Sequence, residues 1–403
     1  MRAVGKNNEW MVKPKYVRRY KDGYPLITKD VLVSGGKTAR EGDIIHLVDT
    51  GHRFIAKGYC GKQNKGIGWV LTTDKNIKLN ASFFKKAIEQ AITHRKPLYK
   101  DAQTNAFRVF NGEGDGIGGL TIDYYDGYYV INWYSEGIYA YKSWVVQTIE
   151  QLSDCQAIYE KKRFKKKGSY IDDDDFVSGK WADFPLIVKE NNMHYAVDLN
   201  DGAMTGIFLD QRDVRKVIRD RYASGKRVLN TFSYTGAFSV AASLGGALQT
   251  TNVDLAKRSL PKTIEQFSVN GIDFEAENIH VMDIFEYFKY ARRKKLTFDM
   301  VILDPPSFAR TKKYAFSVMK DYTKLLTEAL SITEKGGIIV ASTNNAALSR
   351  KKFKNMLVEG FEKEKKSYRI LEEYSLPEDF RVHKQFPSGD YLKVVIMQVV
   401  GTQ

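Results

Sequence analysis

Three aspartates in the second half of the chain stand at the ends of predicted strands, two of them directly after short apolar runs, and this pattern restricts the fold more than any other feature. The three residues are Asp254, Asp283 and Asp304. Upstream of them, Arg227–Gly236 is typical of a strand followed by a tight loop, and Ala237–Leu244 of the small-residue helix that comes next. Strands alternating with helices predict a doubly wound α/β domain, in which the strand ends meet at one edge of the sheet. We therefore expect the three carboxylates to surround one ligand site.

The loop after the first of these strands favours one kind of cofactor. Asp254 follows this strand by about 20 residues, the separation at which such folds place a carboxylate on ribose hydroxyls. A dinucleotide needs the full Gly-x-Gly-x-x-Gly pattern around its phosphates, and here only Gly236 is present. S-adenosylmethionine carries a ribose and no phosphate. The sequence therefore predicts S-adenosylmethionine, and a nicotinamide-dependent oxidoreductase is the weaker alternative.

The third aspartate is followed by two prolines and, shortly after them, by an aromatic residue. Because proline has no N–H, Asp304 and Pro305 offer free carbonyl acceptors on a stiff backbone at a strand end. Phe308 could stack on a flat substrate such as a nucleobase. An Asp-Pro pair alone also forms ordinary turns. Next to the two other strand-end acids, we expect Asp304, Pro305, Pro306 and Phe308 to form the catalytic acceptor site.

Four phrases in the chain carry a resemblance to a known family. They are Glu113–Asp123 (EGDGIGGLTID), Gly206–Arg212 (GIFLDQR), Asn230–Gly236 (NTFSYTG) and Asp304–Phe308 (DPPSF). Over nearly its whole length the chain resembles the ribosomal-RNA methyltransferases that carry an N-terminal PUA domain. The resemblance implies a class I methyltransferase domain, S-adenosylmethionine as methyl donor and 23S-type large-subunit rRNA as substrate. On this interpretation the expected cofactor-binding residues are Asn230, Phe232, Tyr234, Gly236, Asp254, Asp283, Asp304 and Gln211.

One departure from the family bears on the atom that is methylated. Family members that make 5-methylcytosine have a catalytic cysteine on the strand after the DPP motif, whereas that strand here, Gly337–Asn345, has none. Cytosine C5 needs a thiolate to add to the ring first, but a purine nitrogen brings its own lone pair. Cys60 and Cys155 precede the expected catalytic domain and are typical of buried structural thiols. We therefore favour a guanine nitrogen as the methylated atom, most of all N7, with no covalent intermediate between enzyme and RNA. Cytosine C5 is the alternative.

The length of 403 residues has room for two or three domains, and the sequence pattern predicts three in a chain of the α/β class. Residues 1–75 predict short strands in a small barrel that resembles a PUA domain, and residues 76–190 predict a central α+β domain. In the central domain Phe83–Arg95 has the spacing of an amphipathic helix. Residues 191–403 predict the doubly wound, Rossmann-like methyltransferase domain.

Lys plus Arg outnumber Asp plus Glu by 63 to 48, a formal charge of +15 that favours a polyanionic partner. Aromatic residues, Tyr16 and Tyr20, alternate with basic ones on the expected edge of the barrel, a mixture suited to RNA. The expected RNA-contact residues are Lys13, Lys15, Arg18 and Arg19 on this edge and Arg310, Lys312 and Lys313 beyond the DPP motif. A further basic run, Lys161–Lys167, precedes Asp172–Asp175 and predicts a solvated hairpin.

The other sequence features are negative signals. An apolar run of about 18 residues and a signal-peptide core are both missing, so we expect a soluble, cytoplasmic protein. The cysteines and histidines have no zinc-ligand spacing, so no metal is expected. A small-molecule methyltransferase would leave the basic N-terminal modules unexplained, and a non-catalytic assembly factor would not need all three carboxylates. The target nucleotide, the assembly stage of the substrate and the oligomeric state, a homodimer being one option, stay open.

Overall fold

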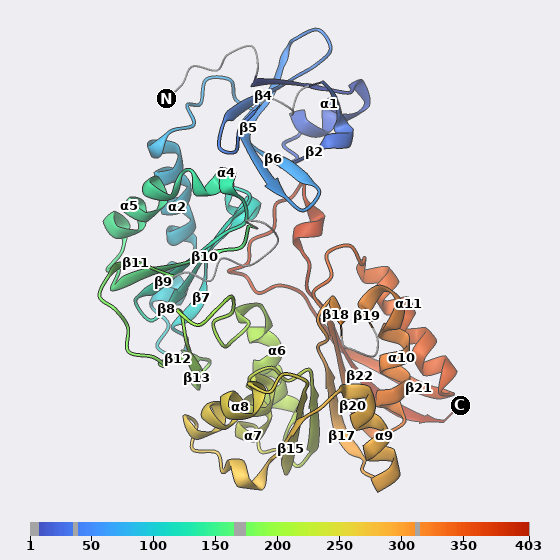
Figure 1. Cartoon of the computed structure of the whole chain (residues 1–403). Helices are drawn as coiled ribbons and strands as arrows, with labels where there is room; N and C mark the ends of the chain where they lie inside the picture. Colours follow the sequence, from blue (N-terminus) through green and yellow to red (C-terminus); the bar gives the residue numbers. More distant parts are fainter. Residues whose placement is uncertain (1–7, 35–38, 165–174, 311–314, 403) are drawn as a thin grey trace. The chain divides into compact units, whose positions relative to one another are not determined.

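The computed structural model describes residues 8–34, 39–164, 175–310 and 315–402, and they form two compact units (Figure 1). Unit 1 contains Met1–Phe184, Asp198–Thr205 and Glu378–Gly389, and unit 2 contains Pro185–Val197, Gly206–Pro377 and Asp390–Gln403. The chain therefore enters each unit three times. The three-domain division at residues 75 and 190 stays a prediction.

The first sheet of unit 1 has six strands in the order β2-β6-β5-β4-β1-β3. They are β1 (Glu9–Val12), β2 (Leu26–Thr28), β3 (Leu32–Ser34), β4 (Ile44–Val48), β5 (Phe54–Gln63) and β6 (Gly66–Thr72), with the short helix η2 (Lys29–Val31) before β3. These strands confirm that short strands occur within residues 1–75, as the sequence predicts. Two of their aromatic residues, Tyr59 and Trp69, pack into the core of the next sheet.

The basic segment near the N-terminus is a helix rather than a strand edge, so this part of the sequence interpretation is wrong. Helix α1 (Pro14–Lys21) begins with a proline, whose fixed φ suits the first helical position. The helical turn places Tyr20 in the core, where its hydroxyl donates to the Leu26 carbonyl at 3.0 Å. Tyr20 therefore cannot stack on a base. Lys15, Arg18 and Arg19 remain exposed on the outer side of α1.

The second sheet of unit 1 has the order β11-β10-β9-β8-β7. Its strands are β7 (Ala106–Asn111), β8 (Leu120–Tyr125), β9 (Tyr128–Trp133), β10 (Ala157–Lys162) and β11 (Phe176–Gly179). The helices are α2 (Ala81–His94), α3 (Lys96–Tyr99), η3 (Gly112–Asp115), α4 (Glu136–Tyr139) and α5 (Lys142–Leu152). Helix α2 confirms the amphipathic prediction, because Phe84, Ile88 and Ala91 are its buried residues.

The two ends of the charged segment Lys161–Asp175 are not simply solvated, as the sequence pattern had suggested. Lys161 and Asp175 form an ion pair whose side chains are only 0% and 5% exposed. Two opposite charges that neutralise each other can enter a protein interior, which neither could do alone. Residues 165–174 lie outside the described residues.

A short return of the chain completes unit 1. The segment Glu378–Gly389, which ends in η7 (Pro387–Gly389), connects two strands of unit 2 and yet belongs to unit 1. Asp379 accepts from two arginines of this unit: its carbonyl oxygen lies 2.5 Å from Arg95 Nη2 and its Oδ2 lies 2.8 Å from the Arg108 backbone nitrogen. The Phe386 ring packs edge-on against Trp69.

Unit 2 contains one seven-stranded sheet in the order β16-β15-β14-β17-β20-β22-β21. The strands are β14 (Arg227–Thr231), β15 (Gln249–Asp254), β16 (Asn278–Val281), β17 (Phe298–Leu303), β20 (Thr333–Thr343), β21 (Lys366–Tyr374) and β22 (Lys393–Thr402). The first five pair in parallel, and β22 runs antiparallel to both β20 and β21. The chain progresses outward from β14 on one side and from β17 on the other, so the topological switch point lies between these two strands.

The remaining elements of unit 2 surround this sheet. Two hairpins, β12 (Leu186–Glu190) with β13 (Met193–Val197) and β18 (Phe308–Arg310) with β19 (Ala315–Ser317), form small sheets of their own. The helices are η4 (Leu209–Gln211), α6 (Arg212–Val217), η5 (Ile218–Tyr222), α7 (Ala237–Leu244), α8 (Ser259–Ser268), η6 (Phe274–Ala276), α9 (Ile284–Lys294), α10 (Val318–Leu330) and α11 (Arg350–Lys363).

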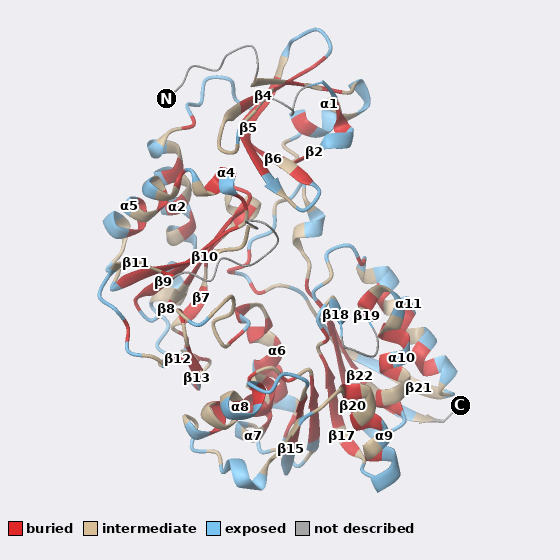
Figure 2. Cartoon of the chain, in the orientation of Figure 1, coloured by how far each residue is buried: buried red, intermediate tan, exposed pale blue. Residues whose placement is uncertain are grey.

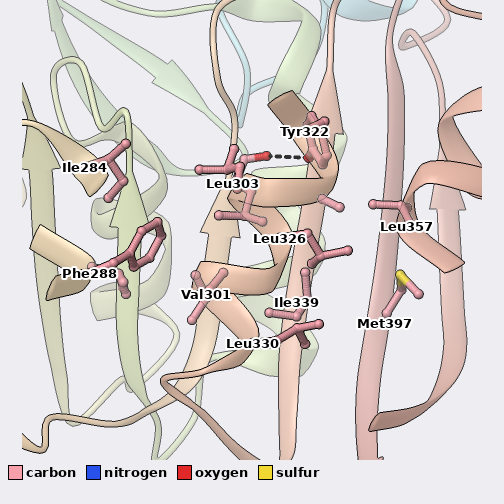
Figure 3. Close-up of a cluster of buried hydrophobic side chains, with 14 of the residues drawn as sticks. Ile284, Phe288, Val301, Leu303, Tyr322, Leu326, Leu330, Ile339, Leu357 and Met397 are labelled. Atoms are coloured by element: carbon pink, nitrogen blue, oxygen red, sulfur yellow. Dashed lines mark hydrogen bonds between the residues drawn. The ribbon is translucent and has the colours of Figure 1, made fainter. Parts of the chain in front are cut away.

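Alternate residues of the central strands point to opposite faces and form two separate cores. The strands β17, β20 and β22 are coloured mostly as buried in Figure 2. On one face Val301, Leu303 and Ile339 pack against helices α9, α10 and α11 (Figure 3). On the other face Met300 and Ile302 pack with residues of α6, η5 and α7. Helices on both faces give the three layers expected of a doubly wound sheet. Within the described parts of the chain, no helix has the length and apolar character needed to cross a membrane.

Candidate active site

The loop after β14 has an unusual backbone conformation. Phe232 and Tyr234 both have φ 52°, and Gly236 has φ 81°, so three alternate residues occupy the left-handed region. Side chains other than glycine rarely adopt this region, and such conformations concentrate at functional sites. A Cβ atom on residue 236 would lie 2.7 Å from Thr263 Cγ2, so only glycine fits there. The loop therefore has a closely determined backbone conformation at the carboxyl edge of the sheet.

Asp254, the last residue of β15, holds this loop in place. Its Oδ2 accepts from the Tyr234 backbone N–H at 2.9 Å, and its Oδ1 accepts from the Ala256 backbone N–H at 2.8 Å. A carboxylate offers about four acceptor sites. Asp254 therefore orders the loop and still has lone pairs for hydroxyl donors such as those of a ribose.

Two other residues expected to bind the cofactor have clear structural partners. Asn230 is buried, and its Nδ2 donates to Ser239 Oγ at 3.1 Å, which ties β14 to α7. Asp283 precedes α9, where its Oδ1 accepts from the Phe285 N–H at 2.9 Å as a helix N-cap. Both residues shape the carboxyl edge of the sheet, and their contact with a cofactor stays a prediction.

The aspartate of the DPP motif lies within a small polar cluster that no local pattern reveals. Gln211 Nε2 donates to Asp304 Oδ1 at 3.2 Å and to Ser342 Oγ at 2.9 Å. Both amide hydrogens of Gln211 are therefore used. Its Oε1 is buried and has no hydrogen-bond partner among the residues that the structure describes. An unpartnered buried acceptor costs about 1–3 kcal/mol, so we expect a ligand donor at this atom.

The electrostatics of Asp304 suit a group that titrates near neutral pH. Burial raises the pKa of its carboxyl to about 6, and the repulsion of Asp210 adds to this, against lowering by hydrogen bonds from Ser342 and Gln211 and by the charge of Arg215. Carboxyls with such shifts are concentrated at functional sites, although structural networks also produce them. Asp304 is ionised above this value and protonated below it.

Two sets of buried hydrogen bonds hold the cluster in place, one made by Arg215 and one by Tyr322. The sequence predicted neither of them. Arg215 pairs with Glu190 through two bonds of 2.7 and 2.6 Å, and its Nη2 also donates to the Phe208 carbonyl at 2.8 Å. This buried pair therefore fixes the segment that carries Gln211. The Tyr322 hydroxyl lies 2.9 Å from the Ser342 carbonyl oxygen and 3.3 Å from that of Leu303, a bond drawn in Figure 3.

The residues after Asp304 form the outer part of the site. Pro305 is buried and Pro306 is exposed, while the Phe308 side chain at the start of β18 is 63% exposed. Ser307 Oγ donates to Asn344 Oδ1 at 2.8 Å, which joins this segment to the end of β20. A large exposed aromatic beside polar acceptors is suited to stacking on a flat base. Arg310 is exposed in β18, and Lys312 and Lys313 lie outside the described residues.

The described side chains of His, Cys, Asp and Glu form no group of three or more that could hold a metal ion. Burial raises the pKa of the Cys60 thiol to about 11 and that of Cys155 to about 12, and both residues lie in unit 1.

Comparison with known proteins gives matches along the whole chain. The family described as S-adenosylmethionine-dependent methyltransferase matches residues 107–392, and a PUA-like domain matches residues 11–73. A Bacillus subtilis (strain 168) protein named "Putative ribosomal RNA large subunit methyltransferase YwbD" is 56% identical over 389 residues, which cover 96% of this chain and 98% of the relative. A Shewanella denitrificans protein named "Ribosomal RNA large subunit methyltransferase I" is 29% identical, with 96% and 98% covered.

Two solved structures are similar to this chain over nearly its whole length. A crystal structure described as "a putative methyltransferase complexed with SAH" is 39% identical and has a TM-score of 0.89, with 97% of this chain and 100% of that chain covered. Another, from Streptococcus mutans, is described as a "putative sam-dependent methyltransferase" and is 38% identical with a TM-score of 0.88 over the same shares.

Proposed function

This chain belongs to the S-adenosylmethionine-dependent methyltransferase family and carries a PUA-like domain, and we propose that it methylates a guanine nitrogen of large-subunit ribosomal RNA, N7 first among the candidates. The names of its relatives support the rRNA substrate. The observation that carries the choice of atom is the cluster of Asp304 and Gln211 beside the exposed Phe308, in a unit whose sequence has no cysteine.

The residues at the carboxyl edge of the sheet fit the cofactor. Asp254 retains lone pairs for the ribose hydroxyls, and the left-handed loop from Phe232 to Gly236 brings backbone toward the ligand without phosphate-binding glycines. The orphan acceptor of Gln211 suits a donor such as an amino group. When bound, S-adenosylmethionine supplies a methyl group on a sulfonium, which is open to in-line attack by a lone pair.

The protein groups then position the acceptor base. We propose that Phe308 stacks on the guanine face while Asp304 and the Pro305 carbonyl accept hydrogen bonds from its amino edge. Transfer of the methyl group to N7 would break its bond to the sulfonium sulfur, release S-adenosylhomocysteine and leave the positive charge on the base, where the ionised Asp304 carboxylate would stabilise it. Orientation and electrostatics then supply the catalysis, since guanine N7 already holds its lone pair in the ring plane and needs no protein nucleophile.

Substitution of Asp254 tests the cofactor half of this proposal. Asp254→Ala removes the carboxylate proposed to hold the ribose hydroxyls and should weaken S-adenosylmethionine binding by about 1.5–3 kcal/mol. Isothermal titration calorimetry on the full chain measures this affinity. Because Asp254 also holds the loop, Asp254→Asn serves as the partner variant and should lose less, since its oxygen still accepts a bond. Unchanged affinity in folded Asp254→Ala would refute the assignment.

Replacement of both cysteines tests the choice of atom. Cys60→Ala with Cys155→Ala should leave turnover nearly intact, because neither thiol lies in the catalytic unit. Phe308→Ala should depress turnover through lost stacking, worth roughly 1–3 kcal/mol per base. The assay transfers radiolabelled methyl groups to rRNA from a strain that lacks the gene, and mass spectrometry identifies the product nucleoside.

Two results would contradict the proposed atom. One is a product that maps to cytosine C5, and the other is a folded double-cysteine variant that binds cofactor but does not methylate. Either result would favour the cytosine alternative. A wild-type chain that binds both cofactor and rRNA and transfers no methyl group would instead favour a non-catalytic assembly factor.

We also propose that unit 1 delivers the RNA. The exposed Lys15, Arg18 and Arg19 of α1 support this role, because phosphate contacts position a nucleic acid without entering the chemistry. Arg19 lies over the Tyr24 ring with 3.3 Å between its guanidinium carbon and the ring centroid, so it is held in an ordered position. A test by deletion of residues 1–78 would be confounded, since Tyr59 and Trp69 belong to the core of the second sheet.

A further inference from the structure

A basic groove lies between α10 and α11, and none of the residues that line it has a role assigned above. It has a volume of about 460 Å³ and is lined by Met319, Lys320, Thr323, Lys324, Thr327, Lys352, Met356, Glu359 and Lys363. The two helices lie side by side in unit 2 (Figure 1). Four of the nine lining residues are lysines and one is a glutamate, so the groove attracts anions.

The positive charge is concentrated at one end of the groove. Lys363 Nζ lies 2.7 Å from Glu359 Oε1, so these two charges neutralise each other. Lys320, Lys324 and Lys352 are exposed and make no ion pair with any carboxylate that the structure describes. The Lys324 ammonium lies 5.3 Å from the centroid of the Phe285 ring, a cation–π contact that orients it. Three cations are thus available to an external ligand.

This end of the groove is directly connected to the candidate active site. The first residue of α10, Val318, donates its backbone N–H to the Ser307 carbonyl at 3.2 Å, and Ser307 belongs to the DPPSF segment. Strand β19, which immediately precedes α10, pairs with β18, where Phe308 lies opposite Ser317. Met319 and Lys320 of the groove therefore lie in the first turn of α10. This helix directly follows β19, the strand that pairs with Phe308.

We propose that the groove between α10 and α11 binds the phosphate backbone of the RNA strand that continues from the target nucleotide. The inference rests on the proposed function, because that function places the target base at Phe308. Three unpaired ammonium groups match a chain of phosphates, while the hydroxyls of Thr323 and Thr327 already donate to the Met356 and Lys324 carbonyls and offer no base-specific donor. The groove therefore contributes affinity without sequence preference.

The test is a charge-neutral triple variant, Lys320→Gln, Lys324→Gln and Lys352→Gln, in the full chain. Glutamine matches lysine in helix propensity, so the helices should persist. Binding is measured with a labelled oligouridylate at several salt concentrations. We expect about tenfold weaker binding and a salt slope lower by about 2, since each phosphate contact on a single strand contributes about 0.7. With rRNA as substrate, KM should rise and kcat should stay near that of the wild type.

A matched control uses three exposed lysines of unit 2, Lys294, Lys295 and Lys335, which lie at the amino-terminal ends of β17 and β20. The control triple loses the same charge and should keep both affinity and salt slope. An equal loss of oligouridylate affinity in both triple variants would contradict the proposed RNA contact in the groove. No loss of affinity in either variant would also contradict it, and an acidic protein would then be the remaining candidate ligand. If the wild-type chain does not methylate rRNA, the proposed function is wrong. The binding measurement with oligouridylate still tests whether the groove contacts RNA.

Discussion

Replacing Arg215 by methionine is expected to lower the free energy of unfolding of unit 2 by about 3–5 kcal/mol, because it leaves the Glu190 carboxylate buried without its partner. The two side chains are only 2% and 0% exposed. The variant should also lower kcat at temperatures where it is folded, since Arg215 holds the Phe208 carbonyl and with it the segment that carries Gln211. Urea denaturation followed by circular dichroism measures the change.

The chain offers two internal controls for this experiment. All five tryptophans lie in unit 1, so tryptophan fluorescence should report a transition that Arg215→Met does not move. A second variant that also replaces Glu190 by leucine should recover much of the loss, because removal of both charges leaves no buried ion unpaired. If the double variant is as unstable as Arg215→Met, packing rather than the unpaired charge explains the effect.

Replacing Asp304 by asparagine is expected to lower kcat/KM by about 10²–10³-fold, the effect typical of removing one preorganised electrostatic group. The wild type should show an acid limb in its pH profile. Burial raises the pKa of Asp304 to about 6, so below this pH the group is neutral and above it the carboxylate is available to the base. Activity should therefore rise with pH through about 6, and the limb should disappear in Asp304→Asn.

Asp220→Asn makes the same chemical change at an exposed position of the same unit. It should keep both the rate and the acid limb. Calorimetry with S-adenosylmethionine shows whether Asp304→Asn still binds the cofactor, which separates loss of chemistry from loss of the complex. An Asp304→Asn enzyme that is fully active, or that keeps the limb, would show that this carboxylate does not stabilise the reacting base.

Local patterns in the sequence were enough to predict the parts of the site that lie on consecutive residues. Helix α7 begins and ends at the predicted residues, Ala237 and Leu244, because small apolar residues between two glycines leave little choice. Asp254 and Asp304 stand at strand ends as expected. For Asp304 the reason is local, since the apolar run Met300–Leu303 in a parallel sheet stops where the polar residue begins. The family match agrees with the resemblance in the four phrases.

The parts that the sequence did not predict depend on long-range contacts. Gln211 meets Asp304 across 93 positions, and Arg215 meets Glu190 across 25. Neither pair forms a local signature, because only the folded sheet brings the partners together. For Tyr20 the local pattern was misleading. Alternating basic and aromatic residues suggested an exposed surface, but in the helix α1 this spacing places Tyr20 on the buried side.

The return of Glu378–Gly389 into unit 1 has a consequence for synthesis of the protein on the ribosome. Domains usually fold as they emerge, the N-terminal one first. Here Asp379 bonds to Arg95 across 284 positions, and β22, which follows the same segment, lies between β20 and β21 in the sheet of unit 2. Both units therefore lack a part of their structure until residues 378–402 have left the exit tunnel, and up to that point the nascent chain must stay unaggregated with neither of its folding units complete.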